Sequence, residues 1–513
     1  MADKKHYTFL QSRNGKTVPA ITSPQGNVLP LHSMIDPVRE AERLVSTIPA
    51  QTGFVIFLGL GGGYAPQAVL ANTDAQVVVI DFNQDGITEL LSSMDFSGLL
   101  KNERFTLLTD PQEADLKKLI LENYKPAIHG GIKVIPLRTK TETDRQKFDF
   151  AAAVIQEAIE SAAADYSVQA HFGKRWFSNI LRNIKAVEAT DSFAAIERFS
   201  GIHDAAIVAA GPSLDRHTGD LLELKSRNVF IICCDTALPV LLHNKIEPDA
   251  VVSIDCQFIS YYHFIGLDQS ALRRIPLFLD ITSPSLVSGF SSLPVFLCGG
   301  HPLAHYISRH WKPLPVLDTS GGNVAYACLS LAELLGVQNL TVFGADFSYI
   351  RSSTYARGSY VFPFFEKKQN RLSPLEALHS SFLYRSPFLP PENPGQKQER
   401  YETAQLRFYR KKFEEKAAGI KAQIKIKRKK TTEEFHRGEK ISAYKFLEQY
   451  RRDVLALSVN SLQGSLKERH SMEIFFTLLP LAAALKKREP ALRAKDLIEE
   501  SKKYCAEEID KFA

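Results

Sequence analysis

The chain of 513 residues is too long for one hydrophobic core, so its length predicts two or three domains. Its composition, 44% hydrophobic and 23% charged, is that of a globular protein, and a net charge of +6 at this length does not indicate nucleic-acid binding. No window reaches the ~18 apolar residues of a membrane span, and the six cysteines lack the spacing of a disulfide framework. We therefore expect a cytoplasmic protein with reduced thiols and without stable membrane insertion.

Residues 1–140 alternate apolar strands with helices. The strand FVIFLGLGGGY enters a turn that holds four glycines, Gly59, Gly61, Gly62 and Gly63. The next strand, VVVIDFN, contains Asp81, about twenty residues beyond the turn, where an acid can bind a ribose hydroxyl in a nucleotide-binding βαβ unit. S-adenosylmethionine or a dinucleotide would suit such a unit. Pro66 departs from the strict glycine spacing, so a Rossmann-like domain that has lost its ligand is an equal alternative.

Residues 141–200 are rich in alanine and place apolar residues three and four positions apart, which predicts a helical connector. Trp176, Asn179 and Asn183 fall on one face of this helix. Helix packing is the expected role of that face.

Residues 201–390 form the second predicted α/β region. Its strands are short apolar runs without alternation, as in a parallel sheet covered on both faces: DAAIVAA, NVFIICCD, AVVSID, IPLFLD, PVFLCG, PVLDTS and NLTVFGAD. Ligands of open α/β sheets bind at the carboxyl ends of the strands. Those ends are therefore the positions to search.

The turn AAGPSLD follows the first of these strands. Gly211 lets a ligand approach the backbone, Pro212 fixes the turn, and Ser213 is a good helix N-cap. A phosphate at this place would meet free amides and the positive end of a helix macrodipole. An ordinary helix start explains the same residues, so both interpretations stay open.

Two further strand ends carry glycine. One ends in Thr319, Ser320, Gly321 and Gly322, and the next ends in Gly344, Ala345 and Asp346. Facing each other across a crevice, such ends would form the two walls of a nucleotide pocket. A helix cap is the alternative role for Asp346.

Residues 391–513 contain charged amphipathic helices and are expected to form a helical C-terminal region. The preceding PFLPPENPGQKQE is polar and rich in proline, which suits a linker or an active-site lid. The basic stretch IKAQIKIKRKK is expected to be a solvated helix or linker, with an acidic partner or membrane surface as the alternative. The whole pattern predicts an α/β protein with two Rossmann-like parallel-sheet domains and a C-terminal helical region.

The segments AAGPSLD, CDTALPVLLHNKIEPDAVVSID and TSGGNVAYACLSLAELLGVQNLTVFGADFSY resemble the core of the motility accessory factor (Maf) family, bacterial proteins tied to flagellin glycosylation. The order GPSL, TSG and G-x-D-F is similar to that of bacterial CMP-sialic-acid-dependent sialyltransferases. The resemblance implies a glycosyltransferase needed for flagellar assembly and motility. It would move a nonulosonic acid, such as pseudaminic or legionaminic acid, from a CMP-linked donor to Ser or Thr of flagellin.

The resemblance also implies binding roles for the strand-end residues. Gly211, Pro212 and Ser213 would lie at the nucleotide, whereas Thr319, Ser320 and Gly321 would contact its cytidine or its sugar. Asp235 stands where the sialyltransferases have an asparagine near the base, and a carboxylate there can accept a hydrogen bond from cytosine but cannot donate one. Asp255, with Gln257 beside it, has a strand-end position that suits a polar ligand contact.

The catalytic groups implied by the resemblance lie further along the chain. Tyr349, Tyr355 and Tyr360 follow the G-x-D-F strand, where the sialyltransferases place phosphate-binding tyrosines. Arg351 and Arg357, in the same loop, are natural partners for a phosphate or for the carboxylate of the donor.

His379 is the expected general base, because the sialyltransferases have a histidine followed by serine downstream of this loop and histidine has a suitable unperturbed pKa of ~6.5. His301 and His305 are further histidines of the same region. No Asp-x-Asp loop or Cys/His spacing indicates a metal site, so we expect no metal and no cofactor besides the CMP-sugar co-substrate.

Three alternatives remain. Archaeal pterin diphosphokinases share the GPSL-bearing domain and would need ATP and Mg²⁺. A methyltransferase would rest on GLGGGY and Asp81 alone. A non-catalytic flagellin-binding factor or chaperone would use the C-terminal helices to hold flagellin.

Overall fold

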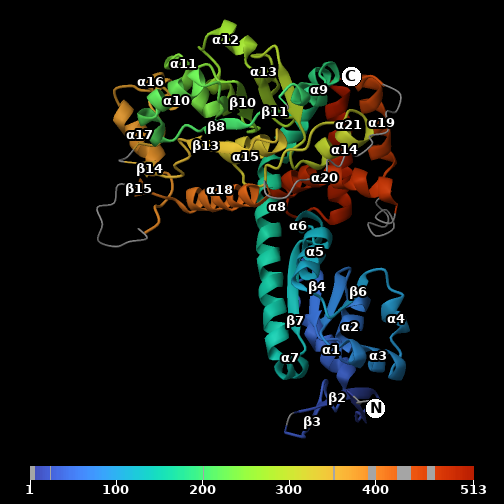
Figure 1. Ribbon diagram of the computed structural model, residues 1–513. Coiled ribbons are helices and arrows are strands. Elements are labelled where there is room, and N and C mark those ends of the chain that lie inside the picture. Colours follow the sequence, from blue (N-terminus) through green and yellow to red (C-terminus); the bar gives the residue numbers. More distant parts are fainter. Residues whose placement is uncertain are drawn as a thin grey trace. The chain divides into compact units, whose positions relative to one another are not determined.

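The computed structural model describes residues 6–23, 25–199, 201–350, 353–390, 400–423, 441–458 and 468–512. The chain divides into two compact units, whose helices and strands are labelled in Figure 1. The first unit combines Met1–Gly173 with Ala456–Tyr504, and the second combines Lys174–Leu455 with Cys505–Ala513. The four segments predicted from the sequence, with their boundaries at 140, 200 and 390, stay a prediction.

The first unit contains a four-stranded parallel sheet in the order β6-β5-β4-β7. Its strands are β4 (Thr52–Leu58), β5 (Gln76–Asp81), β6 (Phe105–Thr109) and β7 (Gly131–Pro136), as the sequence predicted. A three-stranded antiparallel sheet, β1-β2-β3, was not predicted; it comprises β1 (Thr8–Gln11), β2 (Thr17–Thr22) and β3 (Val28–Pro30).

Helices cover both faces of the parallel sheet in the first unit. The helices of this unit are α1 (Pro37–Ser46), α2 (Tyr64–Asn72), α3 (Gln84–Ser93), α4 (Ser97–Leu100), α5 (Glu113–Asn123), α6 (Pro126–His129) and α7 (Arg138–Thr143), together with α20 (Arg469–Arg488) and the first part of α21 (Ala494–Asp510) from the C-terminal region. Because side chains alternate along a strand, Val55 and Phe57 of β4 join one core, whereas Phe54 and Ile56 join the other. The second core is closed by Ile155 and its neighbours on α8 (Arg145–Ala189).

The second unit contains a six-stranded parallel sheet in the order β12-β11-β10-β9-β8-β13. Its strands are β8 (Asp204–Val208), β9 (Phe230–Cys234), β10 (Ala250–Ser253), β11 (Leu277–Asp280), β12 (Pro294–Leu297) and β13 (Asn339–Phe343). Strands β8 to β12 progress in one direction and β13 returns to the other side of β8. The strand order therefore reverses between β8 and β13.

The remaining elements of the second unit surround this sheet. They are α9 (Ser192–Glu197), α10 (Thr218–Ser226), α11 (Leu238–His243), α12 (Gln269–Arg274), α13 (Ser285–Ser288), α14 (Pro302–His310), α15 (Val324–Leu334), α16 (Val361–Glu366), α17 (Leu375–Leu383), α18 (Ala404–Gln423), α19 (Ala443–Ala456), the 3₁₀ turns η1 (Pro212–Arg216), η2 (Asp235–Ala237) and η3 (Phe258–His263), and the small pair β14 (Tyr349–Ile350) and β15 (Arg400–Tyr401). The predicted strand PVLDTS is only a bridge, Cys298 to Val316. Proline at 313 and 315 removes the N–H groups that a longer ladder needs.

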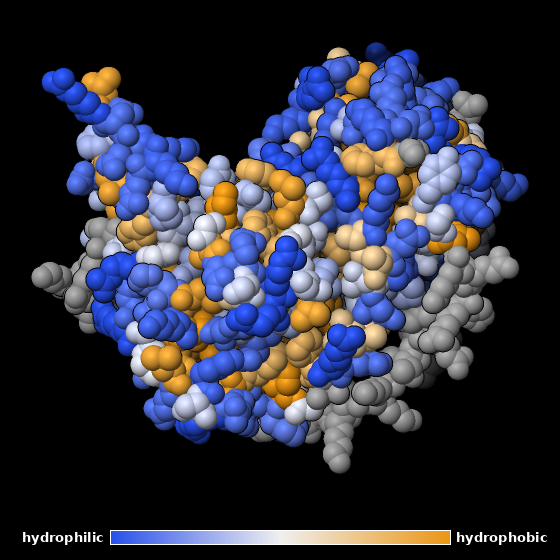
Figure 2. Space-filling view, turned by 90° about the horizontal axis from the view of Figure 1, so that it is seen from above, coloured by the Kyte–Doolittle hydropathy of each residue, from blue (hydrophilic) through white to orange (hydrophobic). Residues whose placement is uncertain are grey.

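The predicted fold class is confirmed: two parallel α/β sheets and a helical C-terminal region. Within the described part of the chain, none of the helices combines the length and apolar character needed to cross a bilayer. Figure 2 shows small apolar areas set among hydrophilic side chains on the face seen from above. Such scattered apolar surface is ordinary and does not by itself mark a docking site.

Candidate active site

The loops after β8 and β13 flank the point where the strand order reverses, which is the usual ligand position in an open α/β sheet. The backbone amide of Gly211 donates to the carbonyl oxygen of Gly344 at 2.8 Å, and the amide of Ser213 donates to Oδ2 of Asp346 at 2.8 Å. A Cβ atom at Gly211 would collide with the Gly344 carbonyl and with Asp346. Glycine is therefore required at 211 by the close approach of the second loop.

The expectation that Ser213 caps a helix is wrong. Pro212 begins the short turn η1, Gly211 stands at the cap position, and Ser213 lies inside the turn. Its amide is held by a carboxylate and is not free for a phosphate. Asp346 thus fixes the GPSL turn, and a bound anion would have to compete with it.

Thr319, Ser320 and Gly321 lead into the amino end of α15. The amide of Ser320 donates to Oδ1 of Asp318 at 3.0 Å, and the hydroxyl of Tyr326 donates to Oδ2 at 2.7 Å. Lys416 of α18 lies 3.0 Å from the same Oδ2 atom. Although partial burial acts to raise the pKa of Asp318, these hydrogen bonds hold it well below its ordinary value.

Both glycine-bearing loops lie against α18. The ring of Phe413 contacts Phe347, which directly follows Asp346, with 5.4 Å between centroids. Tyr409, one turn earlier on the same helix face, lies close to Gly322, where an added Cβ would stand 3.3 Å from its Cε1. The structure thus brings both loops to one turn of α18, and their joint contact with a nucleotide stays a prediction.

Asp235 and Asp255 follow β9 and β10 on the same edge of the sheet. Asp235 is completely buried, and its carboxylate accepts from the hydroxyl of Ser253 and from the amide of Thr236, both at 2.7 Å. Burial raises its pKa to about 6. Burial also raises the pKa of Asp255, whose Oδ1 accepts from the amide of Gln257 at 2.9 Å.

The tyrosine loop brings two of its three tyrosines close to these acids. The rings of Tyr355 and Tyr360 lie 6.1 Å apart. Burial raises the pKa of both hydroxyls, and the Asp235 carboxylate adds to the effect, so both stay protonated and able to donate. Tyr349 is buried in β14, where its ring lies 6.0 Å from that of Phe388.

Of the two arginines expected to bind a phosphate or carboxylate, the structure describes one. Arg357 is mostly exposed and pairs with Asp215 at 3.1 Å. Arg351 lies outside the described residues, as do most of the proline-rich stretch and most of the basic stretch.

His379 lies on α17 in an aromatic layer. Its ring is 5.0 Å from that of Phe365 and 5.3 Å from that of Phe362. Phe365 in turn contacts Phe382, which contacts Tyr355. Two rings therefore stand between His379 and the tyrosine pair, and its role as base stays a prediction.

His263, which sequence reasoning missed, lies beside the tyrosine pair. It ends η3, is 4% exposed, and sets its ring edge-on to Tyr360 with 4.4 Å between centroids. Burial lowers its pKa to about 4. Asp255 was predicted because it follows a strand. His263 ends the turn that comes next, so its position near a strand end was the available signal.

The helix face predicted to pack does so through polar groups. The amide nitrogen of Asn179 donates to the carbonyls of Cys256 and Thr282, at 3.0 and 2.7 Å. Asn183 donates likewise to Ile281 and Ser283, both at 2.8 Å. These bonds hold the chain where it leaves β10 and β11. Trp176 packs edge-on against His301 at 5.6 Å.

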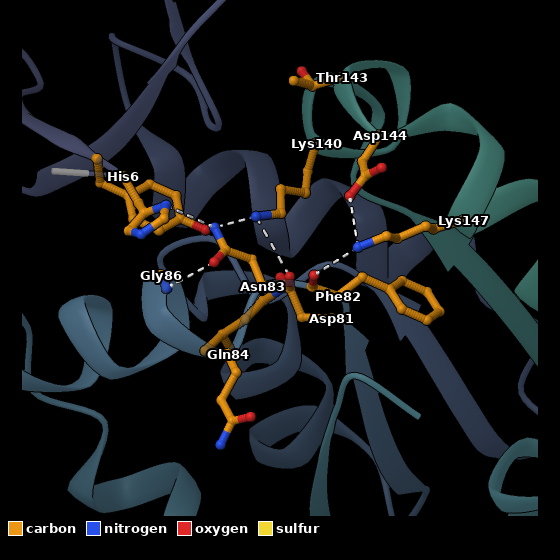
Figure 3. Close-up of polar contacts among 12 residues, drawn as sticks. His6, Asp81, Phe82, Asn83, Gln84, Gly86, Lys140, Thr143, Asp144 and Lys147 are labelled. Carbon is orange, nitrogen blue, oxygen red and sulfur yellow. Dashed lines mark hydrogen bonds and ion pairs between the residues drawn. The ribbon is translucent and has the colours of Figure 1, made fainter. Parts of the chain in front are cut away.

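In the first unit, the residues predicted to contact a nucleotide make polar contacts with other side chains of the protein, and Figure 3 shows those around Asp81 and Lys140. Nε2 of His32 accepts the amide of Gly62 at 2.7 Å. Buried Asp81 lies 3.4 Å from Nζ of Lys140, which also donates to the hydroxyl of Tyr7 at 2.7 Å. These contacts favour the alternative of a Rossmann-like domain that has lost its ligand.

Among the described residues, no group of three or more His, Cys, Asp or Glu side chains is arranged to hold a metal ion. The six cysteines are buried and unpaired, and the Sγ atoms of Cys234 and Cys328 lie 3.7 Å apart.

One family model matches a segment of the second unit. The family model described as 6-hydroxymethylpterin diphosphokinase MptE-like matches residues 178–352. Three uncharacterized proteins of Treponema pallidum (strain Nichols) are similar. One is 33% identical over 175 residues, which are 33% of this chain and 80% of that protein. Another is 45% identical over 93 residues, which are 18% of this chain and 33% of that protein. The third is 25% identical over 233 residues, which are 45% of this chain and 48% of that protein. The matches with these last two therefore span about a third and about half of their lengths.

Among solved structures, the MAf glycosyltransferase from Magnetospirillum magneticum AMB-1 is similar over 100% of this chain and 93% of that chain. The TM-score is 0.52 and the sequence identity is 13%. At this identity the likeness shows the fold. The chain therefore has the fold of a Maf glycosyltransferase, as its sequence motifs predicted, and belongs to one family with the Treponema protein that it matches over 80% of that protein's length.

Proposed function

We propose that the protein is a glycosyltransferase that moves a nonulosonic acid from a CMP-linked donor to Ser or Thr hydroxyls of flagellin in the cytoplasm. The observation that carries this proposal is the cluster of Tyr355, Tyr360, Asp235 and Asp255 at the carboxyl edge of the second sheet, next to the reversal of strand order. The Maf-like fold supports the same class of enzyme.

The reaction asks two things of this site. The bond between the anomeric carbon and the phosphate oxygen breaks, and its electron pair leaves with CMP, so that phosphate needs hydrogen-bond donors. Tyr355 and Tyr360, which keep their protons, can supply them. The acceptor oxygen forms the new bond to the anomeric carbon and gives its proton to a base, for which His379 remains our candidate.

A second candidate is a pterin diphosphokinase, because the MptE-like family model, which matches residues 178–352, includes the strand-end loops after β8, β9, β10 and β13. That reaction uses ATP with Mg²⁺, whereas the proposed transfer uses a CMP-sugar. Titration of the purified full chain with CMP and with ATP plus Mg²⁺ separates the two. Preference for CMP supports the transferase, and preference for ATP with a hydroxymethylpterin supports the kinase.

Transfer itself is tested by the mass of flagellin. A strain that lacks the gene should produce flagellin without the glycan mass, and the wild-type gene should restore it. The variants Tyr355→Phe and Tyr360→Phe should restore it poorly, while Tyr384→Phe, an exposed tyrosine of the same unit, should restore it fully. Flagellin of unchanged mass with poor export would instead favour the non-catalytic flagellin-binding factor.

A further inference from the structure

The imidazole of His263 has a buried nitrogen without a partner. Nδ1 finds no hydrogen-bond partner among the residues that the structure describes, and the side chain is 4% exposed. An unsatisfied buried polar atom costs stability, so its presence in a folded protein calls for an explanation. A phenylalanine would fill similar space without this cost.

The surroundings of His263 connect this nitrogen to the candidate site. The ring meets Tyr360 edge-on, 4.4 Å between centroids, and Tyr360 is in turn next to Tyr355. Asp255, on the loop before η3, lies close enough to act on the charge of His263. His263 thus belongs to the group of side chains from which the proposed function takes its phosphate donors.

A neutral His263 can still donate one hydrogen bond to an anion. Burial disfavours the charged ring, so the imidazole is neutral near pH 7 and carries its single proton on one of its two nitrogens. A phosphate oxygen at Nδ1 would select the tautomer with the proton on Nδ1. The Tyr360 ring, which lies against the imidazole, is only partly buried.

We propose that His263 is a further nucleotide-binding residue, whose Nδ1–H donates to the phosphate of the nucleotide when Tyr360 turns toward the same phosphate. This inference rests on the proposed function, since it needs a nucleotide in the second unit. It adds a phosphate contact from η3 to those of the tyrosine loop.

Two substitutions separate the contribution of Nδ1 from that of the ring. His263→Phe keeps a flat ring of similar size and removes Nδ1, whereas His263→Asn places an amide nitrogen near the position of Nδ1 without the ring. Isothermal titration of the full chain with CMP, and with cytidine up to millimolar concentration, measures the phosphate contribution. The thermal midpoint of each variant reports on folding.

We expect His263→Phe to weaken CMP about tenfold or more, as for a lost hydrogen bond to a charged group, with cytidine affinity unchanged. His263→Asn should keep most of the CMP affinity. The thermal midpoint of His263→Phe should equal or exceed that of the wild type, because the unsatisfied atom is gone. A purely structural histidine would give the opposite order of thermal midpoints.

Two results would overturn the inference while leaving the proposed function intact. One is CMP affinity in His263→Phe within twofold of the wild type. The other is an equal loss of CMP and cytidine affinity, which would indicate a packing role. If the wild-type chain itself binds neither ligand, the proposed function fails first and the assignment of His263 with it.

Discussion

The carboxylate of Asp346 accepts the backbone amide of Ser213 at 2.8 Å, across the line where the strand order of the second sheet reverses. The contact joins the GPSL turn after β8 to the loop after β13. Since Gly211 also donates to Gly344, two bonds clamp these loops together. The turn that resembles a phosphate loop is thus organised in advance by a carboxylate of the protein.

Removing this carboxylate should loosen the clamp. We expect Asp346→Ala to lower the free energy of unfolding by about 1–3 kcal/mol, because the half-buried amide of Ser213 loses its acceptor. Asp346→Asn keeps an oxygen acceptor, so its free energy of unfolding should lie between those of the wild type and Asp346→Ala. Denaturant unfolding followed by circular dichroism measures the order. An Asp346→Ala variant as stable as the wild type would show that the amide finds another partner, such as water.

Gly211→Ala tests the close approach of the two loops. The new methyl group would collide with the Gly344 carbonyl and with Asp346, so the clamp must open and stability should fall by about 1–3 kcal/mol. CMP affinity should fall with it. Gly219→Ala, in α10, is the matched control, since no atom lies within 4 Å of its added Cβ. It should stabilise the helix by up to about 1 kcal/mol. Equal effects of both substitutions would contradict the tight contact at 211.

Much of the fold could be predicted because each buried strand is a continuous apolar run. FVIFLGL and VVVIDFN became β4 and β5, and each long amphipathic run after residue 400 became a helix. The β1-β2-β3 sheet was missed because its strands are short and two of them are partly exposed, which leaves a weak pattern. PVLDTS shows the reverse failure, since Pro315 within it and Pro313 just before it remove N–H groups that a ladder needs.

The candidate site was harder to predict than the fold, because its chemistry depends on contacts between distant loops. The glycine at 211 signalled a close approach, but only the structure shows that the approaching group is Gly344 with Asp346. Likewise, the acid at 81 suggested a ribose site, whereas the structure pairs its carboxylate with Lys140, which is distant in sequence. His263 was not predicted, because nothing in the sequence SYYHF indicates which residues surround its ring.

The pH dependence of stability should reveal the buried His301. Burial lowers its pKa to about 3, while the unfolded chain protonates it near the ordinary value of ~6.5. Between these values the unfolded state binds more protons, so stability falls as pH decreases from 6.5 and levels off below about 3. His301→Asn keeps an N-cap for the amide of Leu303, which His301 now accepts at 3.1 Å, and removes the titration. Its thermal midpoint should fall less than that of the wild type between pH 7 and pH 5.

Asp235 provides a comparison of opposite sign. Its folded pKa of about 6 lies above the ordinary value of 3.8, so the folded state binds more protons between these values and acidification favours folding. Asp235→Asn removes this compensation, and its thermal midpoint should fall more steeply than that of the wild type. If the thermal midpoints of His301→Asn and Asp235→Asn both change with pH as that of the wild type does, neither group titrates as described.

The Asp81–Lys140 pair predicts how the first unit responds to loss of one charge. Both side chains are buried, and Nζ of Lys140 lies 3.4 Å from Oδ1 of Asp81, an oxygen with no hydrogen-bond partner among the described residues. Lys140→Met leaves a buried carboxylate without its cation and should cost about 3–5 kcal/mol of unfolding free energy. The double variant Asp81→Asn, Lys140→Met removes both charges and keeps an oxygen for the amide of Leu60, so it should be more stable than Lys140→Met alone. A double-mutant cycle by denaturant unfolding measures the coupling. Strictly additive effects would mean that the two charges do not stabilise each other in the folded protein.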